Sequence, residues 1–303
     1  MKGSVSLDGV HILLTYKCTM ECEHCFVWGS PKAAGTFSTK QISRLLKQAK
    51  QIPTVTRVYF EGGEPFLFYP ILLKGVEMAR REGFEVGIVS NAYWGTDKDD
   101  AALWLGPLAK SGVADLSLSS DEYHGLEEEA KNALTAIAAA KKLAIPVAKM
   151  EVKNLEFYKC ESQGNLDAGD LMFRGRASKE LAGKVRKKPP NSFTTCPEEP
   201  PGIKRVHVDA YGNVQFCQGI TIGNVWKRSL KDIMESFDPE KHPIIGPLMR
   251  GGPAQLAKER GLKPKKGYAD ACQMCYDLRC VMRERNMFPS TLRPNQAYGV
   301  YGT

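Results

Sequence analysis

LTYKCTMECEHC, residues 14–25, places three cysteines within eight positions: Cys18, Cys22 and Cys25. The stretch follows a short apolar run, and a loop there can bring three thiolates to one metal centre. A structural zinc site has four protein ligands, so three leave one metal position open for chemistry. Two interpretations remain at this point: an iron–sulfur cluster with one open iron, and a zinc knuckle that takes His24 as its fourth ligand.

Composition limits the class of protein. The chain has 303 residues, 43% hydrophobic and 25% charged, which is ordinary for one large or two smaller soluble domains. Nine cysteines, an odd number, favour metal binding or catalysis over a disulfide framework. No apolar stretch is long enough to span a membrane, and Met1–Lys17 lacks a signal-peptide core, so we expect a cytoplasmic protein without a membrane partner.

Hydrophobic patterning predicts alternating strands and helices over the first half of the chain. Short apolar runs predict strands at residues 10–15, 55–60, 84–89, 113–118 and 147–152. Helices are expected between them, the first starting at a capping box of Ser38 and Gln41. This alternation predicts an α/β fold with a parallel sheet, open or curled into a partial barrel.

Polar and glycine-rich loops follow the predicted strands. Besides the cysteine loop, they are residues 61–65 (EGGEP), 90–91 (SN) and 119–121 (SSD). Binding loops gather at the carboxyl ends of parallel strands. The pair Gly62 and Gly63 alone would indicate a tight turn, but beside the cysteine strand it predicts backbone brought close to a polar ligand.

The Cys-x3-Cys-x2-Cys motif after Leu-Thr-Tyr, together with Gly-Gly-Glu-Pro after the second strand, resembles the radical S-adenosylmethionine (SAM) superfamily. The resemblance covers roughly Val10 to Arg176 and implies a partial (β/α)6 parallel barrel. It also implies that Cys18, Cys22 and Cys25 bind a [4Fe–4S] cluster whose open iron is chelated by SAM. An external one-electron donor, similar to flavodoxin or ferredoxin, would reduce the cluster. SAM would then yield a 5′-deoxyadenosyl radical that abstracts a substrate hydrogen.

The resemblance also implies roles for the other loops. Many members have an aromatic ring before the third cysteine, a place that His24 takes here. The usual arginine after strand four is missing, because residues 127–129 are all glutamate. We therefore expect Arg174 or Arg176 to bind the SAM carboxylate, since a guanidinium suits that group. The remaining expected SAM contacts are Gly62, Gly63 and Glu64 at the methionine amine, Ser90 and Asn91 near the ribose, and Ser117 or Ser119 near the methionine moiety.

The chain changes character after the fifth strand. Residues 174–188 are basic and residues 189–192 (PPNS) are typical of a linker, so the expected domains are 1–176, a linker over 177–195, and 196–303. The basic run is interpreted as a solvated connection. It lacks the interleaved aromatic residues of a nucleic-acid platform, so nucleic acid is not an expected partner.

The last third of the chain contains a second group of cysteines. Alternating residues 206–209 and 214–216 predict a β-hairpin, and a short helix is expected near 229–237, which together indicate a small α+β domain. The spacing of Cys196, Cys217, Cys272 and Cys275 predicts a four-thiolate metal site, for which zinc is the generic interpretation. Gly212-x4-Cys217, residues 222–225 (IGNV) and the closing Cys-x2-Cys resemble the SPASM and twitch extensions of radical SAM enzymes. That resemblance implies one auxiliary [4Fe–4S] cluster on these four cysteines.

Cys280 is left over by this assignment, unless it replaces one of the four ligands. A buried, inert thiol is the simple interpretation of both Cys280 and Cys160. The alternative hypothesis makes Cys280 a catalytic thiol that donates a hydrogen atom, as an epimerase would need.

The predicted reaction is modification of a peptide or protein side chain by oxidation, crosslinking or epimerisation. SPASM relatives are mostly peptide and protein maturases, whereas twitch relatives include enzymes that dehydrogenate or cyclise small molecules. Dehydrogenation or rearrangement of a small metabolite is therefore the alternative. Seventeen residues precede Cys18, too few for the leader-binding domain of many peptide maturases, and this lowers the expectation of a peptide substrate without removing it. A non-catalytic zinc-binding regulatory protein is the second alternative.

Overall fold

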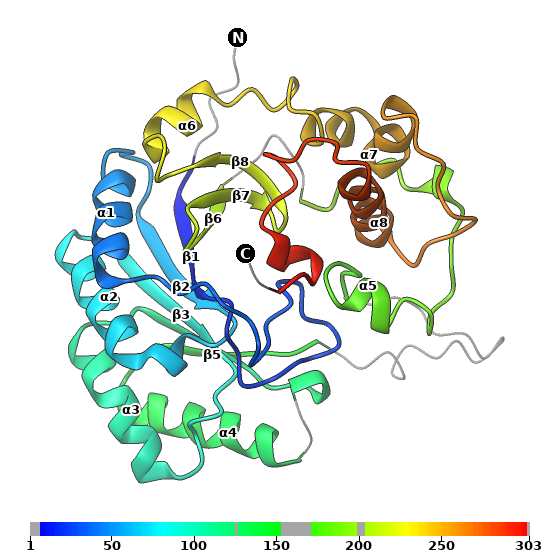
Figure 1. Cartoon of the computed structure of the whole chain (residues 1–303). Helices are drawn as coiled ribbons and strands as arrows, with labels where there is room; N and C mark the ends of the chain where they lie inside the picture. The colour runs from blue at the N-terminus through cyan, green and yellow to red at the C-terminus, as the bar shows by residue number, and fades with distance from the viewer. Residues whose placement is uncertain (1–6, 125–126, 153–170, 199–203, 302–303) are drawn as a thin grey trace.

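The computed structural model describes residues 7–124, 127–152, 171–198 and 204–301 (Figure 1). The described strands form one sheet in the order β5-β4-β3-β2-β1-β6-β7-β8. The strands from β5 across to β6 are parallel, and β6, β7 and β8 are antiparallel. The bounds are β1 Gly9–Thr15, β2 Arg57–Gly62, β3 Glu85–Ser90, β4 Asp115–Ser119, β5 Val147–Met150, β6 Arg205–Asp209, β7 Asn213–Cys217 and β8 Ile220–Asn224. The sheet does not close within the described chain, and this confirms the predicted α/β fold with a partial barrel.

Helices α1–α4 connect the first five parallel strands and line the outer side of the curved sheet (Figure 1). Their bounds are α1 Thr39–Ala49, α2 Tyr69–Arg81, α3 Lys98–Lys110 and α4 Glu127–Lys142. The predicted capping box is present at α1, where the Ser38 hydroxyl accepts from the Gln41 amide and the Gln41 side chain accepts from the Ser38 amide. None of the helices in the described chain has the length and apolar character needed to cross a membrane.

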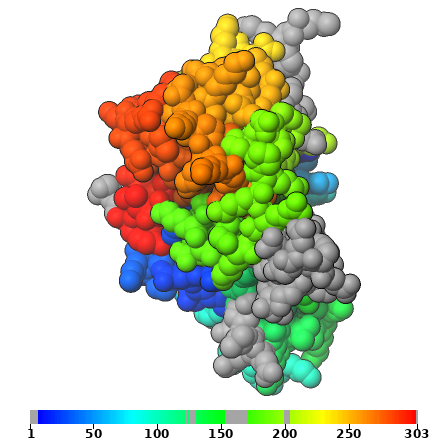
Figure 2. Space-filling model, turned by 90° about the vertical axis from the view of Figure 1, so that its right-hand side faces the viewer, coloured from blue at the N-terminus to red at the C-terminus, as the bar shows by residue number. Residues whose placement is uncertain are grey.

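The C-terminal elements lie on two sides of the sheet. Helix α6, Leu230–Ser236, lies near α1, whereas α5, α7 and α8 lie across the concave side (Figure 1). Their bounds are α5 Ala177–Glu180, α7 Ile245–Glu259 and α8 Ala271–Glu284. Figure 2 shows the segment around 171–198, in green, packed beside the orange residues of α7 and the loop that follows it. Short 3-10 helices are η1 Pro65–Phe68, η2 Glu122–His124, η4 Pro190–Ser192 and η5 Asn295–Tyr298.

The predicted hairpin of 206–216 forms as β6 and β7, and it extends the N-terminal sheet. Strand β6 pairs in parallel with β1, so His207 lies opposite His11 in the register. The sheet therefore runs without a break across the expected boundary between the two domains.

The core packs between the sheet and the outer helices. Along β1, Val10, Ile12 and Leu14 are fully buried in the same cluster as Ile42 and Leu45 of α1. Because side chains alternate along a strand, the residues between them face the concave side. The same alternation in β2 and β6 directs polar residues inward. The inward-facing residues used below are His11, Tyr59, Glu61, His207 and Asp209.

Candidate active site

One cavity of about 560 Å³ brings the three cysteines of the first motif together with the loops after β2, β3 and β4. A cavity of this size accommodates a ligand of cofactor size. Of the predicted site residues, the structure places these in its wall: Cys18, Cys22, Cys25, Gly62, Gly63, Ser90, Asn91, Ser119 and Arg174. The loops therefore converge as expected for the carboxyl ends of parallel strands.

Hydrogen-bond donors point at two of the three sulfurs. The Met20 amide lies 3.4 Å from Cys18 Sγ, and the Gly29 amide lies 3.2 Å from Cys25 Sγ. Asn91 Nδ2 is 3.6 Å from Cys18 Sγ. Burial raises the pKa of the Cys18 thiol to about 11, so in the absence of metal this group is protonated at neutral pH. Metal binding would then release the proton, and the N–H donors would stabilise the ligating thiolates.

Two glycines allow the loop after β2 to lie directly against the cysteine loop. A Cβ on Gly62, whose φ is +143°, would be 2.2 Å from the Thr15 carbonyl oxygen. A Cβ on Gly63 would be 2.2 Å from the Lys17 carbonyl oxygen. In their place, the Gly63 amide donates to Thr15 and the Glu64 amide donates to Lys17. The close backbone approach predicted from this pair occurs, and its partner in the structure is the cysteine loop.

Glu64 joins the loops after β2 and β3. Its buried carboxylate accepts from Ser90 Oγ at 2.9 Å, the Asn91 amide at 2.7 Å and the Phe66 amide at 3.0 Å. Burial raises the pKa of Glu64 to about 7. The Asn91 side chain continues the connection by donating to Thr19 Oγ1 at 3.0 Å. Glu64 therefore fixes Ser90 and Asn91 against the cysteine loop, while its own carboxylate lies behind the cavity wall.

The structure separates the two serines that the sequence left as alternatives. Ser119 lines the cavity. Ser117 lies outside the described wall, and its hydroxyl donates to Asp115 at 3.4 Å. Ser119 is thus the one with access to a ligand in this cavity.

A cluster of one aspartate and two histidines, which was not predicted as a group, lies on the same wall. His124 Nδ1 lies 2.8 Å from Asp121, and His24 packs against the His124 ring at a centroid distance of 4.8 Å. Burial, followed by the neighbouring His124, lowers the pKa of His24 to about 4, so the His24 ring is neutral. The sequence signals for it were His24 between two cysteines and the place of Asp121 in the loop after a predicted strand.

Residues 12–152 match the model of the radical SAM superfamily, a span that contains the three cysteines and the four converging loops. Over these residues the chain resembles a radical SAM domain. Such a domain indicates an enzyme that uses a [4Fe–4S] cluster and SAM, and three thiols in one cavity with N–H donors at their sulfurs fit that cofactor pair.

Similar proteins match this chain either over part of its length or at low sequence identity. YydG of Bacillus subtilis (strain 168), which is named as a peptide biosynthesis protein, is 29% identical over 115 residues, or 38% of this chain. The match spans about a third of that relative's length (36%). Among solved structures, anSMEcpe with bound AdoMet and Cp18Cys peptide aligns with a TM-score of 0.51 and 14% identity, over 92% of this chain and 99% of that one. BtrN in complex with AdoMet and 2-DOIA aligns with a TM-score of 0.50 and 17% identity, over 76% and 82%. At these identities the structures support the fold alone.

Arg174 and Arg176, the two arginines expected to bind the SAM carboxylate, lie in different surroundings beside the cavity that contains the three cysteines. Arg176 is buried, and its guanidinium donates to the backbone carbonyls of Cys22 at 2.7 Å and Gly29 at 2.8 Å. Its own amide donates to the Cys25 carbonyl. Arg176 therefore clamps the cysteine loop from behind, whereas Arg174 lines the cavity.

Arg174 also reaches the second group of cysteines. Its Nη1 donates to Glu198 and lies 3.3 Å from Cys217 Sγ. Its guanidinium carbon lies 5.3 Å from the centre of the Phe26 ring, in the wall of the first cavity. One cation thus contacts the surroundings of both thiol groups.

The second group of cysteines lines a smaller cavity behind Arg174. Cys196, Cys217, Cys272 and Cys275 all contribute to its wall. Cys272 and Cys275 lie near the start of α8, which Asp270 caps by accepting from the Gln273 amide. The buried Arg279, one turn further along, also lines this cavity and donates to the Gln218 carbonyl. Four thiols and two guanidinium groups are therefore brought together, an arrangement that suits a metal centre of net negative charge.

Cys280 lies outside the wall of this four-thiol cavity. It is partly buried, and burial raises its pKa, so its thiol is protonated at neutral pH. Cys160 falls outside the described residues.

Proposed function

We propose that this chain is a radical SAM enzyme that modifies a peptide or protein side chain. The observation that carries the proposal is the convergence of three thiols with the glycine, serine and asparagine loops in one cavity. When bound, the cluster and SAM supply a 5′-deoxyadenosyl radical that abstracts a hydrogen atom from the substrate. YydG supports the peptide class because it is named as a peptide biosynthesis protein, although the match covers only part of it.

We assign the cofactor roles as follows. Cys18, Cys22 and Cys25 would ligate the cluster, and Arg176 would keep their loop in shape through its carbonyl contacts. The Gly62–Gly63 backbone, with Ser90 and Asn91, would orient SAM, and Glu64 would fix the latter two residues. Ser119 would face the methionine moiety. Arg174 is the cation in the wall that would offset the SAM carboxylate.

We propose that Cys196, Cys217, Cys272 and Cys275 ligate an auxiliary [4Fe–4S] cluster. Four thiol ligands would complete the coordination of its irons, so this group suits electron transfer rather than binding of SAM. A net oxidation of the substrate would need a one-electron acceptor, which is the chemistry that this cluster would supply. Arg174 and Arg279 would lower the cost of placing an additional electron beside them.

The test is an anaerobic incubation of reconstituted enzyme with SAM, a chemical reductant and candidate peptides. We expect 5′-deoxyadenosine to form in amounts that depend on one peptide, and deuterium to move from a single labelled side-chain position into it. Dependence on a small metabolite and on no peptide would reject the peptide substrate. Zinc without iron in anaerobically purified protein would reject the enzyme.

A further inference from the structure

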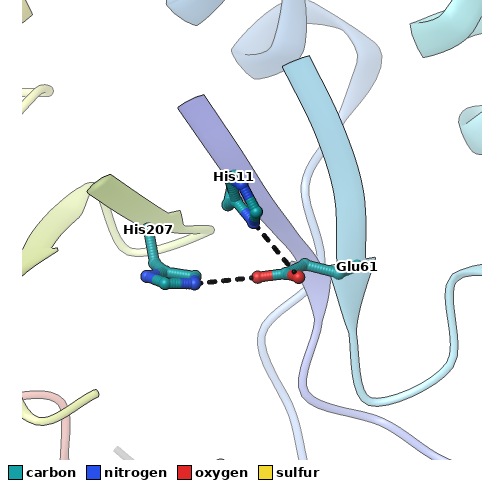
Figure 3. Close-up of side chains that lie close together, drawn as sticks. All are labelled: His11, Glu61 and His207. Carbon is teal, nitrogen blue, oxygen red and sulfur yellow. Dashed lines mark ion pairs between the residues drawn. The ribbon is translucent and has the colours of Figure 1, made fainter. Parts of the chain in front are cut away.

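Three side chains from adjacent parallel strands converge on the concave side of the sheet (Figure 3). They are His11 of β1, Glu61 of β2 and His207 of β6. His11 of β1 pairs with His207 of β6 in the register. On β2, Glu61 lies directly after the residue that pairs with Ile12 of β1. Because all three strands belong to the rigid sheet, the spacing of these groups is set by strand pairing rather than by a loop.

The three groups point at a common centre. His11 Nδ1 lies 3.3 Å from Glu61 Oε2, and His207 Nε2 lies 3.1 Å from Glu61 Oε1. One nitrogen from each imidazole and one carboxylate oxygen all lie within 4.8 Å of one another. Ligands about 2.1 Å from a metal ion are separated by about 3–4 Å, so only a small adjustment would bring these atoms to that spacing.

The contacts within this group lack the direction of good hydrogen bonds. The imidazole nitrogens lie within 3.3 Å of the Glu61 oxygens, but the buried His11 Nδ1 and Glu61 Oε1 have no hydrogen bond of normal geometry among the described residues. Buried polar atoms in native proteins almost always have a partner, and an orphaned set is a sign of an unseen ion or water.

The surroundings hold the triad in place and leave one side open. The His11 ring stacks on Tyr59 at a centroid distance of 4.8 Å, and the Tyr59 hydroxyl is anchored on Asp115. Glu61 itself lines the cavity that contains Cys18, Cys22 and Cys25. A metal bound here would therefore have three protein ligands, with its free positions turned toward that cavity.

We propose that His11, Glu61 and His207 form a binding site for one divalent first-row metal ion, separate from both cysteine groups. Two imidazoles and one carboxylate suit Mn²⁺, Fe²⁺ or Zn²⁺, whereas thiolate groups select softer ions. The open positions would take water or an oxygen atom of a bound substrate. Metal binding itself does not depend on the proposed radical reaction.

The test is a Mn²⁺ titration of the reconstituted enzyme with its clusters oxidised, followed by the electron paramagnetic resonance (EPR) signal of free Mn²⁺. Mn²⁺ is chosen because it prefers nitrogen and oxygen ligands to thiolates. We expect about one bound Mn²⁺ per chain, and at least about tenfold weaker binding in Glu61→Gln and in His207→Gln, since even indirect contacts to a metal are worth that much. Tyr59→Phe, which keeps the ring beside His11 but removes the hydroxyl that anchors it on Asp115, should weaken binding less than either ligand substitution.

Iron content and circular dichroism show whether each variant has folded. Glu61→Gln is the most conservative change, so it keeps the test valid if His207→Gln does not fold. His124→Ala examines the other histidine group of the cavity wall. The proposal is overturned if the parent protein binds no Mn²⁺, if Glu61→Gln binds it equally well, or if binding is lost only in His124→Ala.

Discussion

The two cysteine groups differ in how the chain presents them. Cys18, Cys22 and Cys25 lie on a loop held by backbone hydrogen bonds, beside a cavity of about 560 Å³. In the second group, Cys272 and Cys275 lie near the start of helix α8, and two arginines share the cavity wall. The first arrangement leaves space for a ligand next to three thiols, and the second surrounds four thiols with protein. Ligand number and access are the basis on which we propose a reactive centre at the first group and an electron-transfer centre at the second.

The segment around residues 173–176 connects the two groups. Arg176 binds the carbonyls behind the first cysteine loop, and Arg174 contacts Cys217 of the second group. The Phe173 amide donates to Asp270, the cap of α8. Because one short segment contacts both groups, its residues offer ways to change one group and observe the other.

Loss of a ligand from each group should have the largest and most unequal effects. Cys18→Ala should lose about four of eight irons and abolish 5′-deoxyadenosine formation. Cys272→Ala should lose a similar amount of iron but still cleave SAM under reducing conditions. Iron and sulfide assays with chromatography of the products check both. If Cys272→Ala lost SAM cleavage while Cys18→Ala kept it, the assignment of the two groups would be reversed.

Removal of the cation between the groups should act mainly on the second. Arg174→Gln leaves the partly buried Glu198 carboxylate without its closest cation, at a cost of about 3 kcal/mol in the free energy of unfolding. Arg174→Lys, which keeps the charge, should lose less. The Arg174→Gln protein should reconstitute with less auxiliary cluster, as measured by iron content and by the EPR signal of the reduced protein. Unchanged iron content and stability in Arg174→Gln would show that the contact is dispensable.

A methyl group at the contact between loops should disturb only the first group. Gly63→Ala would place Cβ against the Lys17 carbonyl and should cost about 2 kcal/mol or more in unfolding free energy. Gly106→Ala is the matched control, because no atom lies within 4 Å of its added Cβ and it lies inside α3. There alanine should stabilise the helix by up to about 1 kcal/mol. Chemical denaturation compares the two, and equal effects would count against the tight contact.

The smallest expected effect is a difference in the pH dependence of stability between Glu64, beside the first cysteine group, and Glu198, beside the second. Burial raises the pKa of Glu64 to about 7, above its usual 4.5, so the folded state binds a proton more tightly than the unfolded state. Stability from this group is present below pH 4.5 and falls as the pH rises toward 7. For Glu198, burial alone would raise the pKa, but Arg174 outweighs burial and holds it below 4.5. Its stabilising contribution is present above pH 4.5 and is lost as the pH falls.

Melting temperatures of the anaerobic protein between pH 5 and 8 measure these slopes. Relative to the parent protein, Glu64→Gln should lose the decline between pH 5 and 7, at most about 1.4 kcal/mol per pH unit for one group. Glu198→Gln should show its deficit across this range and less of it toward acid. If the two substitutions changed the pH dependence of stability in the same direction, the opposite environments of Glu64 and Glu198 would be contradicted.

Local patterns in the sequence predicted much of the first group. Short apolar runs located β1 to β5, and the Ser38–Gln41 capping box located α1. The cysteine spacing and the glycine pair each lie within a short stretch of sequence, so they can be recognised without knowledge of the tertiary structure. Arg176 shows the limit of this approach, because only the fold reveals that its guanidinium is used by the carbonyls of Cys22 and Gly29.

Long-range pairing set the rest. The hairpin of β6 and β7 was predicted locally, but its pairing with β1 joins residues almost two hundred positions apart. Helix α7 was hidden by Gly251, Gly252 and Pro253, which kink it where it meets residues 193–195. The His11–Glu61–His207 group had no local signal at all, since its members come from three separate strands.

The central claim is that the three-thiol group is the open centre and the four-thiol group the closed one. The most direct measurement is EPR of the reduced Cys272→Ala and Cys18→Ala proteins, each with and without SAM. We predict that SAM changes the g values of the cluster that remains in Cys272→Ala and leaves those in Cys18→Ala unchanged. A SAM-dependent change in Cys18→Ala alone, or no change in either protein, would contradict it.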